Sequence, residues 1–138
     1  MVRRSGLVFA AYVPRASGLA GLIERASARP GQVSAALLRE AAQTGIFRNQ
    51  SDIGFQEAYY PLVGELEDLF ERAGLQVVDV VSLKSIMNGL GPHVSNLQQD
   101  VRLEAERVAD TWNRDPSVIR TCGHVIFISK RIGESDSA

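Results

Sequence analysis

Apolar residues occur along the chain either in continuous runs or at helical spacing, and these two patterns predict the elements of an α/β fold. Leu7–Val13 (LVFAAYV) is an apolar run without clear alternation, which is typical of a strand buried on both faces. Leu75–Leu83 is rich in β-branched residues and predicts a second strand, and His124–Ser129 predicts a third. We therefore expect a small sheet built from these three strands.

Helical spacing of apolar residues appears in four further segments. They are residues 17–28, 32–44, 61–73 and 95–112. Ser17 is expected to cap the first helix, and Gly45 to end the second. Pro61 suits the first position of the third helix, and Ser95 with Gln98 forms a capping-box pattern for the fourth.

The stripe of the fourth helix runs from Leu97 to Trp112, and we expect it to be buried with Trp112 as its anchor.

Ile46–Tyr60 mixes aromatic and polar residues without a sustained period, which indicates a loop packed onto the rest of the protein. Asn88–Pro92 indicates a turn. Since no repeat or composition break is present, we expect a single domain over residues 1–138 with a frayed tail at 133–138.

Composition narrows the class of protein. The 138 residues are 45% hydrophobic and 22% charged, with a net charge of −1, which is ordinary for a globular domain and argues against a nucleic-acid or acidic-membrane partner. The single cysteine, Cys122, excludes an intrachain disulfide and favours a reducing cytoplasm. No apolar run reaches the roughly 18 to 20 residues that a membrane span needs. We expect a cytoplasmic protein without a membrane partner.

Three segments, taken in order, resemble the C-terminal half of class I S-adenosylmethionine-dependent methyltransferases. RRSGLVFAAYVPR is similar to that family's fifth strand, YYPLVGELEDLFERAGLQVVDVVSL to a helix followed by the sixth strand, and CGHVIFISKR to the seventh strand. The resemblance covers about residues 6–131. It implies a partial Rossmann-like fold with about four helices and a three-stranded mixed sheet. In the family's order 5-7-6, the seventh strand lies antiparallel between the fifth and the sixth.

The family's cofactor-binding half has no counterpart in this sequence. Gly89-Leu90-Gly91 is its only Gly-x-Gly, and Pro92 follows it without the strand, turn and helix that cradle a nucleotide-like cofactor. The resemblance implies methyl transfer to a small molecule, but we do not expect the chain alone to bind S-adenosylmethionine or to be active. Leu7–Val13 is expected to be an open sheet edge, which predicts a homodimer or a complementary chain pairing there.

Six residues are candidates for the acceptor site. They are Tyr12, Arg15, Phe47, Phe55, Tyr59 and Tyr60. The four later aromatics lie where the family often shapes its acceptor pocket, and Tyr12 and Arg15 follow the first strand, at the sheet edge where α/β folds bind ligands. The alternatives are that the aromatics only seal the loop onto the helices, which we favour, and that Arg15 lies in solvent.

The other reactive side chains form no recognisable catalytic or metal-binding arrangement. His93 and His124 have no carboxylate or cysteine at ligand spacing, so no metal site is expected, and Cys122 fits a small buried residue. Glu65–Glu71 predicts a solvated helix face. Two functions remain open: a truncated or split methyltransferase-like domain that supplies the acceptor side, or a non-catalytic binding or assembly subunit that holds a partner or a hydrophobic ligand through residues 46–60. A third, an unrelated small α/β enzyme, ranks last because the sequence offers no nucleophile or metal-binding group for it.

Overall fold

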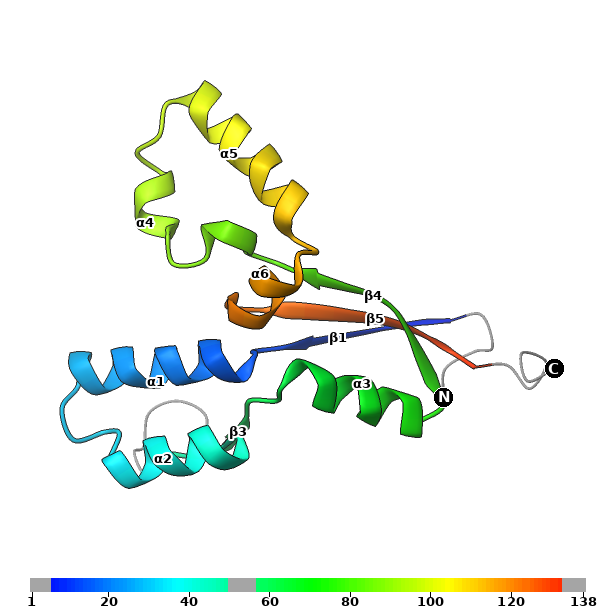
Figure 1. The fold of residues 1–138 in the computed structure, drawn as a ribbon. Coiled ribbons are helices and arrows are strands. Elements are labelled where there is room, and N and C mark those ends of the chain that lie inside the picture. The colour runs from blue at the N-terminus through cyan, green and yellow to red at the C-terminus, as the bar shows by residue number, and fades with distance from the viewer. Residues whose placement is uncertain (1–5, 50–56, 133–138) are drawn as a thin grey trace.

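The computed structural model describes residues 6–49 and 57–132, which form an α/β fold with a three-stranded and a two-stranded antiparallel sheet (Figure 1). The strands are β1 (Leu7–Tyr12), β2 (Ile46–Arg48), β3 (Glu57–Tyr59), β4 (Leu75–Ser82) and β5 (Val125–Arg131). The helices are α1 (Arg15–Ala28), α2 (Ala35–Thr44), α3 (Val63–Arg72), the 3₁₀ turn η1 (Ser85–Met87), α4 (Gly91–Val94), α5 (Gln99–Trp112) and α6 (Pro116–Thr121).

The main sheet has the order β1-β5-β4, with β5 antiparallel to both neighbours. Phe9 lies opposite Ile128 on one side of β5, and Val80 lies opposite Phe127 on the other. The three long strands are therefore adjacent in the expected order. The expectation of a mixed sheet is wrong, because neither ladder between these strands is parallel.

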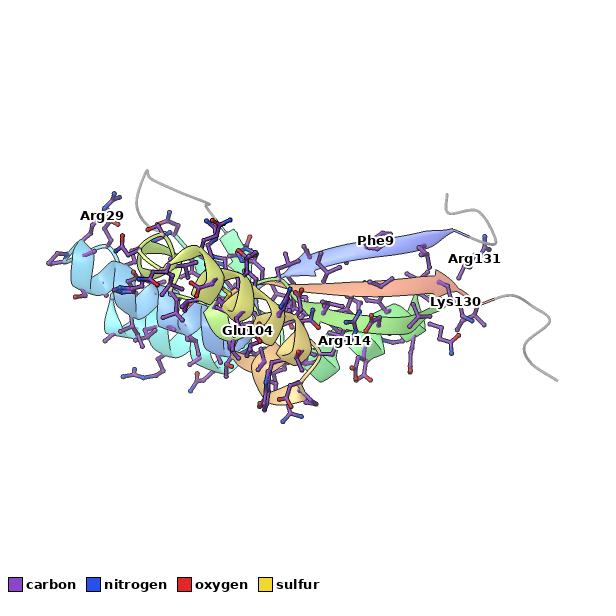
Figure 2. The ribbon with its side chains drawn as sticks, turned by 90° about the horizontal axis from the view of Figure 1, so that it is seen from above. Phe9, Arg29, Glu104, Arg114, Lys130 and Arg131 are labelled. Carbon is purple, nitrogen blue, oxygen red and sulfur yellow. The ribbon has the colours of Figure 1, made fainter. Side chains whose placement is uncertain are left out.

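Only one face of β1 is covered by other elements of the described chain. Val8 and Ala10 face a core formed with α3, α6 and β5, whereas Leu7 is 54% exposed and Phe9 is 63% exposed on the opposite face. Figure 2 shows Phe9 on β1, one of the two outer strands of this sheet. The prediction that this strand is buried on both faces is therefore wrong for the described residues.

Two hydrophobic cores stabilise the fold. The larger one is built around Phe127, which is fully buried and contacts the Tyr12 ring edge-on at a centroid distance of 5.3 Å. Cys122 is buried in this core, as the sequence predicts. The smaller core joins α1, α2 and β2 through Leu22 and Phe47, among other residues.

The segment expected to be a loop contains a short hairpin. Ile46 lies opposite Tyr59, and Arg48 opposite Glu57, so β2 and β3 satisfy each other's backbone hydrogen bonds. Arg48 also forms an ion pair with Glu40 of α2 at 2.6 Å. The hairpin therefore fixes the chain on both sides of residues 50–56, which lie outside the described residues.

The first two helices begin differently from the prediction. α1 begins at Arg15, directly after Pro14, so Ser17 lies inside the helix and does not cap it. α2 begins at Ala35, where the Ser34 hydroxyl accepts a hydrogen bond from the Leu37 N–H at 3.2 Å. Gly45 ends α2 as predicted, in the left-handed conformation with φ of +77°.

The helices α3 and α5 start later than predicted. Leu62 is the N-cap of α3, so Pro61 lies outside the helix and not at its first position. α5 has Gln98 as its N-cap without a side-chain cap, so the predicted capping box at Ser95 does not start it. A proline or serine near a helix start narrows the boundary to a few residues without fixing it.

Together η1, α4 and α5 form an arm that extends from the end of β4 (Figure 1). α5 contacts η1 and buries Ala109, while Val101 is 49% exposed and Trp112 is 48% exposed. The prediction that the stripe of this helix is buried around Trp112 is therefore wrong for the described residues. None of the described helices combines the length and apolar character that a membrane crossing requires.

Candidate functional site

A cleft of about 510 Å³ opens at the carboxyl end of β1, between the starts of α1 and α3 and the helix α6. We call it the β1-end cleft; its lining includes Pro14, Arg15, Pro61, Val80, Ile119 and Arg120. Its wall is largely apolar, with charged side chains from α1, α3 and α6. A site of this kind suits a small organic molecule.

Arg15 is anchored at one side of this cleft. Its backbone N–H donates to the Pro61 carbonyl at 3.0 Å, and its Nε donates to the Tyr60 carbonyl at 3.0 Å. Its Nη2 reaches the two carboxylate oxygens of Glu65 at 2.9 and 3.1 Å, and the side chain is only 11% exposed. The alternative that Arg15 lies in solvent is therefore wrong: it joins the start of α1 to the segment that enters α3.

Glu65 accepts several hydrogen bonds at the junction between the start of α1 and the segment that enters α3. Besides Arg15, its carboxylate accepts from the Tyr59 hydroxyl and from the Leu62 N–H, each at 2.8 Å. The Leu62 N–H, and then Tyr59 and Arg15, lower the pKa of Glu65 against an opposing effect of burial. The hydrogen bond to Glu65 is the main cause that raises the pKa of Tyr59. Glu65 is therefore not part of a merely solvated helix face.

Three of the sequence-predicted candidates meet at this junction: Arg15, Tyr59 and Tyr60. The ring of Tyr60 packs on the smaller core, where it lies directly against Gly18 of α1. Tyr59 stays 53% exposed and contributes its hydroxyl group. Sequence reasoning missed Glu65, although its position three residues after the N-cap Leu62 is typical of a residue that bonds back to the cap N–H.

The other candidates lie elsewhere. Phe47 is 2% exposed and belongs to the smaller core, so its ring lies away from the β1-end cleft. Tyr12 packs in the main core, where its hydroxyl group is buried without a hydrogen-bond partner among the described residues, and burial raises its pKa. Phe55 lies outside the described residues.

The Gly89-Leu90-Gly91 segment does not form a Rossmann-type cradle for S-adenosylmethionine. Gly89, with φ of +82°, follows η1 instead of a strand, and it leads into α4, which spans only Gly91–Val94. A nucleotide-like cofactor needs a strand, a glycine-rich turn and a full helix N-terminus. The part of the chain that the structure describes also contains no group of three or more histidine, cysteine, aspartate or glutamate side chains placed to hold a metal ion.

Comparison with protein-family models finds no match, and comparison with curated proteins finds no similar sequence.

Proposed function

We propose that this chain is the acceptor side of a class I methyltransferase-like domain. It binds a small organic molecule in the β1-end cleft and pairs along β1 with a complementary unit that holds S-adenosylmethionine. The observation that supports this proposal is the strand order β1-β5-β4. Because β5 is antiparallel to both neighbours, β1 and β4 run in the same direction with a reversed strand between them, as the resemblance implies for the fifth, seventh and sixth strands.

The position of the cleft agrees with an acceptor site. It lies at the carboxyl end of β1, the end of a strand at which open α/β sheets bind their ligands. Pro61 and Ile119 contribute apolar surface to the cleft, and Arg120 contributes hydrogen-bond donors. Arg15 holds the two sides of the cleft together through Glu65 and does not itself remain free for a ligand.

The edge of β1 is the surface proposed for the complementary unit. Among the described strands β1 pairs only with β5, so its other backbone edge is open. The exposed side chains of Leu7 and Phe9 stand on the same strand. An added strand satisfies the open backbone groups, and a helix that follows it covers the apolar side chains. In this proposal the cofactor cradle belongs to the added unit.

The second candidate is a non-catalytic binding or assembly subunit. The sequence places its partner on residues 46–60, whereas the exposed side chains of β1 favour a partner at that strand. This candidate requires a partner at β1 but no cofactor. The two candidates therefore differ in one measurable property, which is whether the assembled complex binds S-adenosylhomocysteine.

The experiment purifies the tagged chain alone and together with what assembles on it in its native cells, and measures binding of radiolabelled S-adenosylhomocysteine by equilibrium dialysis. We expect binding on the order of micromolar for the complex and none for the chain alone. Phe9→Lys is expected to abolish assembly and cofactor binding. Val108→Lys, at a 40% exposed position on α5, is the matched control and is expected to change neither.

Cofactor binding by the chain alone contradicts the proposed division of the fold. A complex that assembles through β1 but binds no cofactor favours the assembly subunit. Equal effects of Phe9→Lys and Val108→Lys contradict β1 as the pairing edge.

A further inference from the structure

A second cavity, of about 730 Å³, lies between the turn that follows β4 and the helix α5. Ser82 at the end of β4 and Ser85 in the turn line one side, and Ala109 and Asp110 of α5, with Asn113 just after it, line the other. It shares no lining residue with the β1-end cleft, so the two are separate sites. This cavity is independent of the proposed function.

Ser85 is the unusual residue of this cavity. It is 5% exposed, and its hydroxyl group has no hydrogen-bond partner among the described residues. Its φ of +46° lies in the left-handed region, which L-residues other than glycine rarely occupy. The conformation is held by the Ser82 hydroxyl, which accepts the Ser85 N–H at 2.7 Å. A buried hydroxyl without a partner and a strained backbone both cost folding free energy, and their combination is typical of functional sites.

The charges around the cavity balance. Lys84 and Arg102 supply two positive charges, and Glu106 and Asp110 supply two negative charges. Arg102 and Glu106 neutralise each other at 3.0 Å, while Lys84 and Asp110 form no ion pair with any described residue. Apolar side chains complete the wall, including Leu83, Met87 and Val94. A ligand with a net charge gains nothing from such a lining, whereas an uncharged or zwitterionic one finds partners for each of its groups.

We propose that the cavity binds an uncharged or zwitterionic small molecule that carries an apolar group, and that Ser85 hydrogen-bonds to it. In this proposal the Ser85 hydroxyl reaches the ligand by rotating about χ1 to another staggered position. The ligand then supplies the partner that the described residues do not offer to this hydroxyl group.

The test is an NMR titration of the ¹⁵N-labelled full chain with four probes that share one ring and differ in charge: benzyl alcohol, L-phenylalanine, benzoate and benzylamine. We expect benzyl alcohol and L-phenylalanine to shift the amide signals of residues 82–87 and 105–113, with Kd values on the order of millimolar. Benzoate and benzylamine are expected to bind more weakly. Preferential binding of either charged probe, or no shift of these signals by any probe, overturns the proposal.

Three variants locate the contact. Ser85→Ala is expected to weaken benzyl alcohol binding about fivefold, which corresponds to one neutral hydrogen bond. Ser129→Ala is the matched control, because the Ser129 hydroxyl is also buried without a described partner but lines neither cavity. Asp110→Asn leaves a net positive lining and is expected to favour benzoate over benzylamine. Equal binding by the Ser85 and Ser129 variants, or no change of charge preference in Asp110→Asn, contradicts the assignment.

Discussion

Glu65 accepts hydrogen bonds from Arg15, Tyr59 and Leu62, and replacing it by alanine tests whether these bonds hold the β1-end cleft together. Loss of the bond to the Leu62 N–H removes a helix cap worth about 1 kcal/mol. Arg15, 11% exposed, loses its carboxylate partner, which costs about 1–3 kcal/mol. Tyr59 is 53% exposed, so water replaces its lost partner at little cost. We expect Glu65→Ala to lower the free energy of unfolding by about 2–4 kcal/mol.

Urea unfolding followed by circular dichroism measures this loss. Glu67→Ala is the matched control, because Glu67 is an exposed residue of the same helix and the two substitutions change helix propensity alike. We expect the control to stay within about 0.5 kcal/mol of the original chain. A double-mutant cycle with Arg15→Ala should give a coupling of about 1 kcal/mol or more. Equal losses in the Glu65 and Glu67 variants would refute the reasoning.

The pH dependence gives a second measurement on the same residue. The folded-state pKa of Glu65 lies below its ordinary value of 4.5, so folding favours the ionised carboxylate. Its contribution is therefore fully present at a pH well above 4.5 and is lost as the pH falls through the folded-state pKa. The difference in unfolding free energy between the original chain and Glu65→Ala should shrink in acid. A difference that stays constant from about pH 7 to about pH 3 contradicts the assigned role.

Two further pairs of substitutions test packing, each by thermal or urea unfolding. Gly18→Ala places a Cβ atom 2.5 Å from the Tyr60 ring and is expected to destabilise by about 1–3 kcal/mol. Gly21→Ala in the same helix meets nothing within 4 Å and is expected to stabilise by about 0.5–1 kcal/mol; the same sign for both contradicts the packing of Tyr60 on α1. Phe127→Ala, at a fully buried position, is expected to cost about 3–5 kcal/mol, whereas Phe9→Ala should cost less than about 1 kcal/mol; similar losses would mean that Phe9 is covered.

The long elements could be predicted because their apolar or β-branched runs are long enough to recognise. The apolar run that begins at Leu7 and the β-branched run that begins at Leu75 predict β1 and β4 within one residue at each end. The hairpin of β2 and β3 could not be predicted, because strands of three residues are too short to show a period. Its pairing also depends on contacts between distant parts of the chain.

The candidate site could be predicted only in part, for a related reason. Arg15 and Tyr59 stand out because they follow a strand or belong to an aromatic segment. Glu65 does not, because helical periodicity separates apolar from charged faces and leaves all charged positions alike. Its partner Arg15 lies 50 residues away in sequence, so only the folded chain reveals the pair.

The exposed apolar residues of β1 and α5 show what such patterns leave undetermined. An apolar pattern indicates that a side chain is suited to burial, but not which surface covers it. The prediction of burial failed in this way for both Phe9 and Trp112. The two surfaces differ in their backbones: α5 satisfies its hydrogen bonds internally, whereas the outer edge of β1 is open among the described strands. An open strand edge pairs with an added strand through backbone hydrogen bonds, and these bonds fix how the two strands align. An apolar helix stripe offers no such bonds and does not fix the alignment of a partner. For this reason β1, and not α5, is the surface proposed for the complementary unit, and the pair Phe9→Lys and Val108→Lys distinguishes between them.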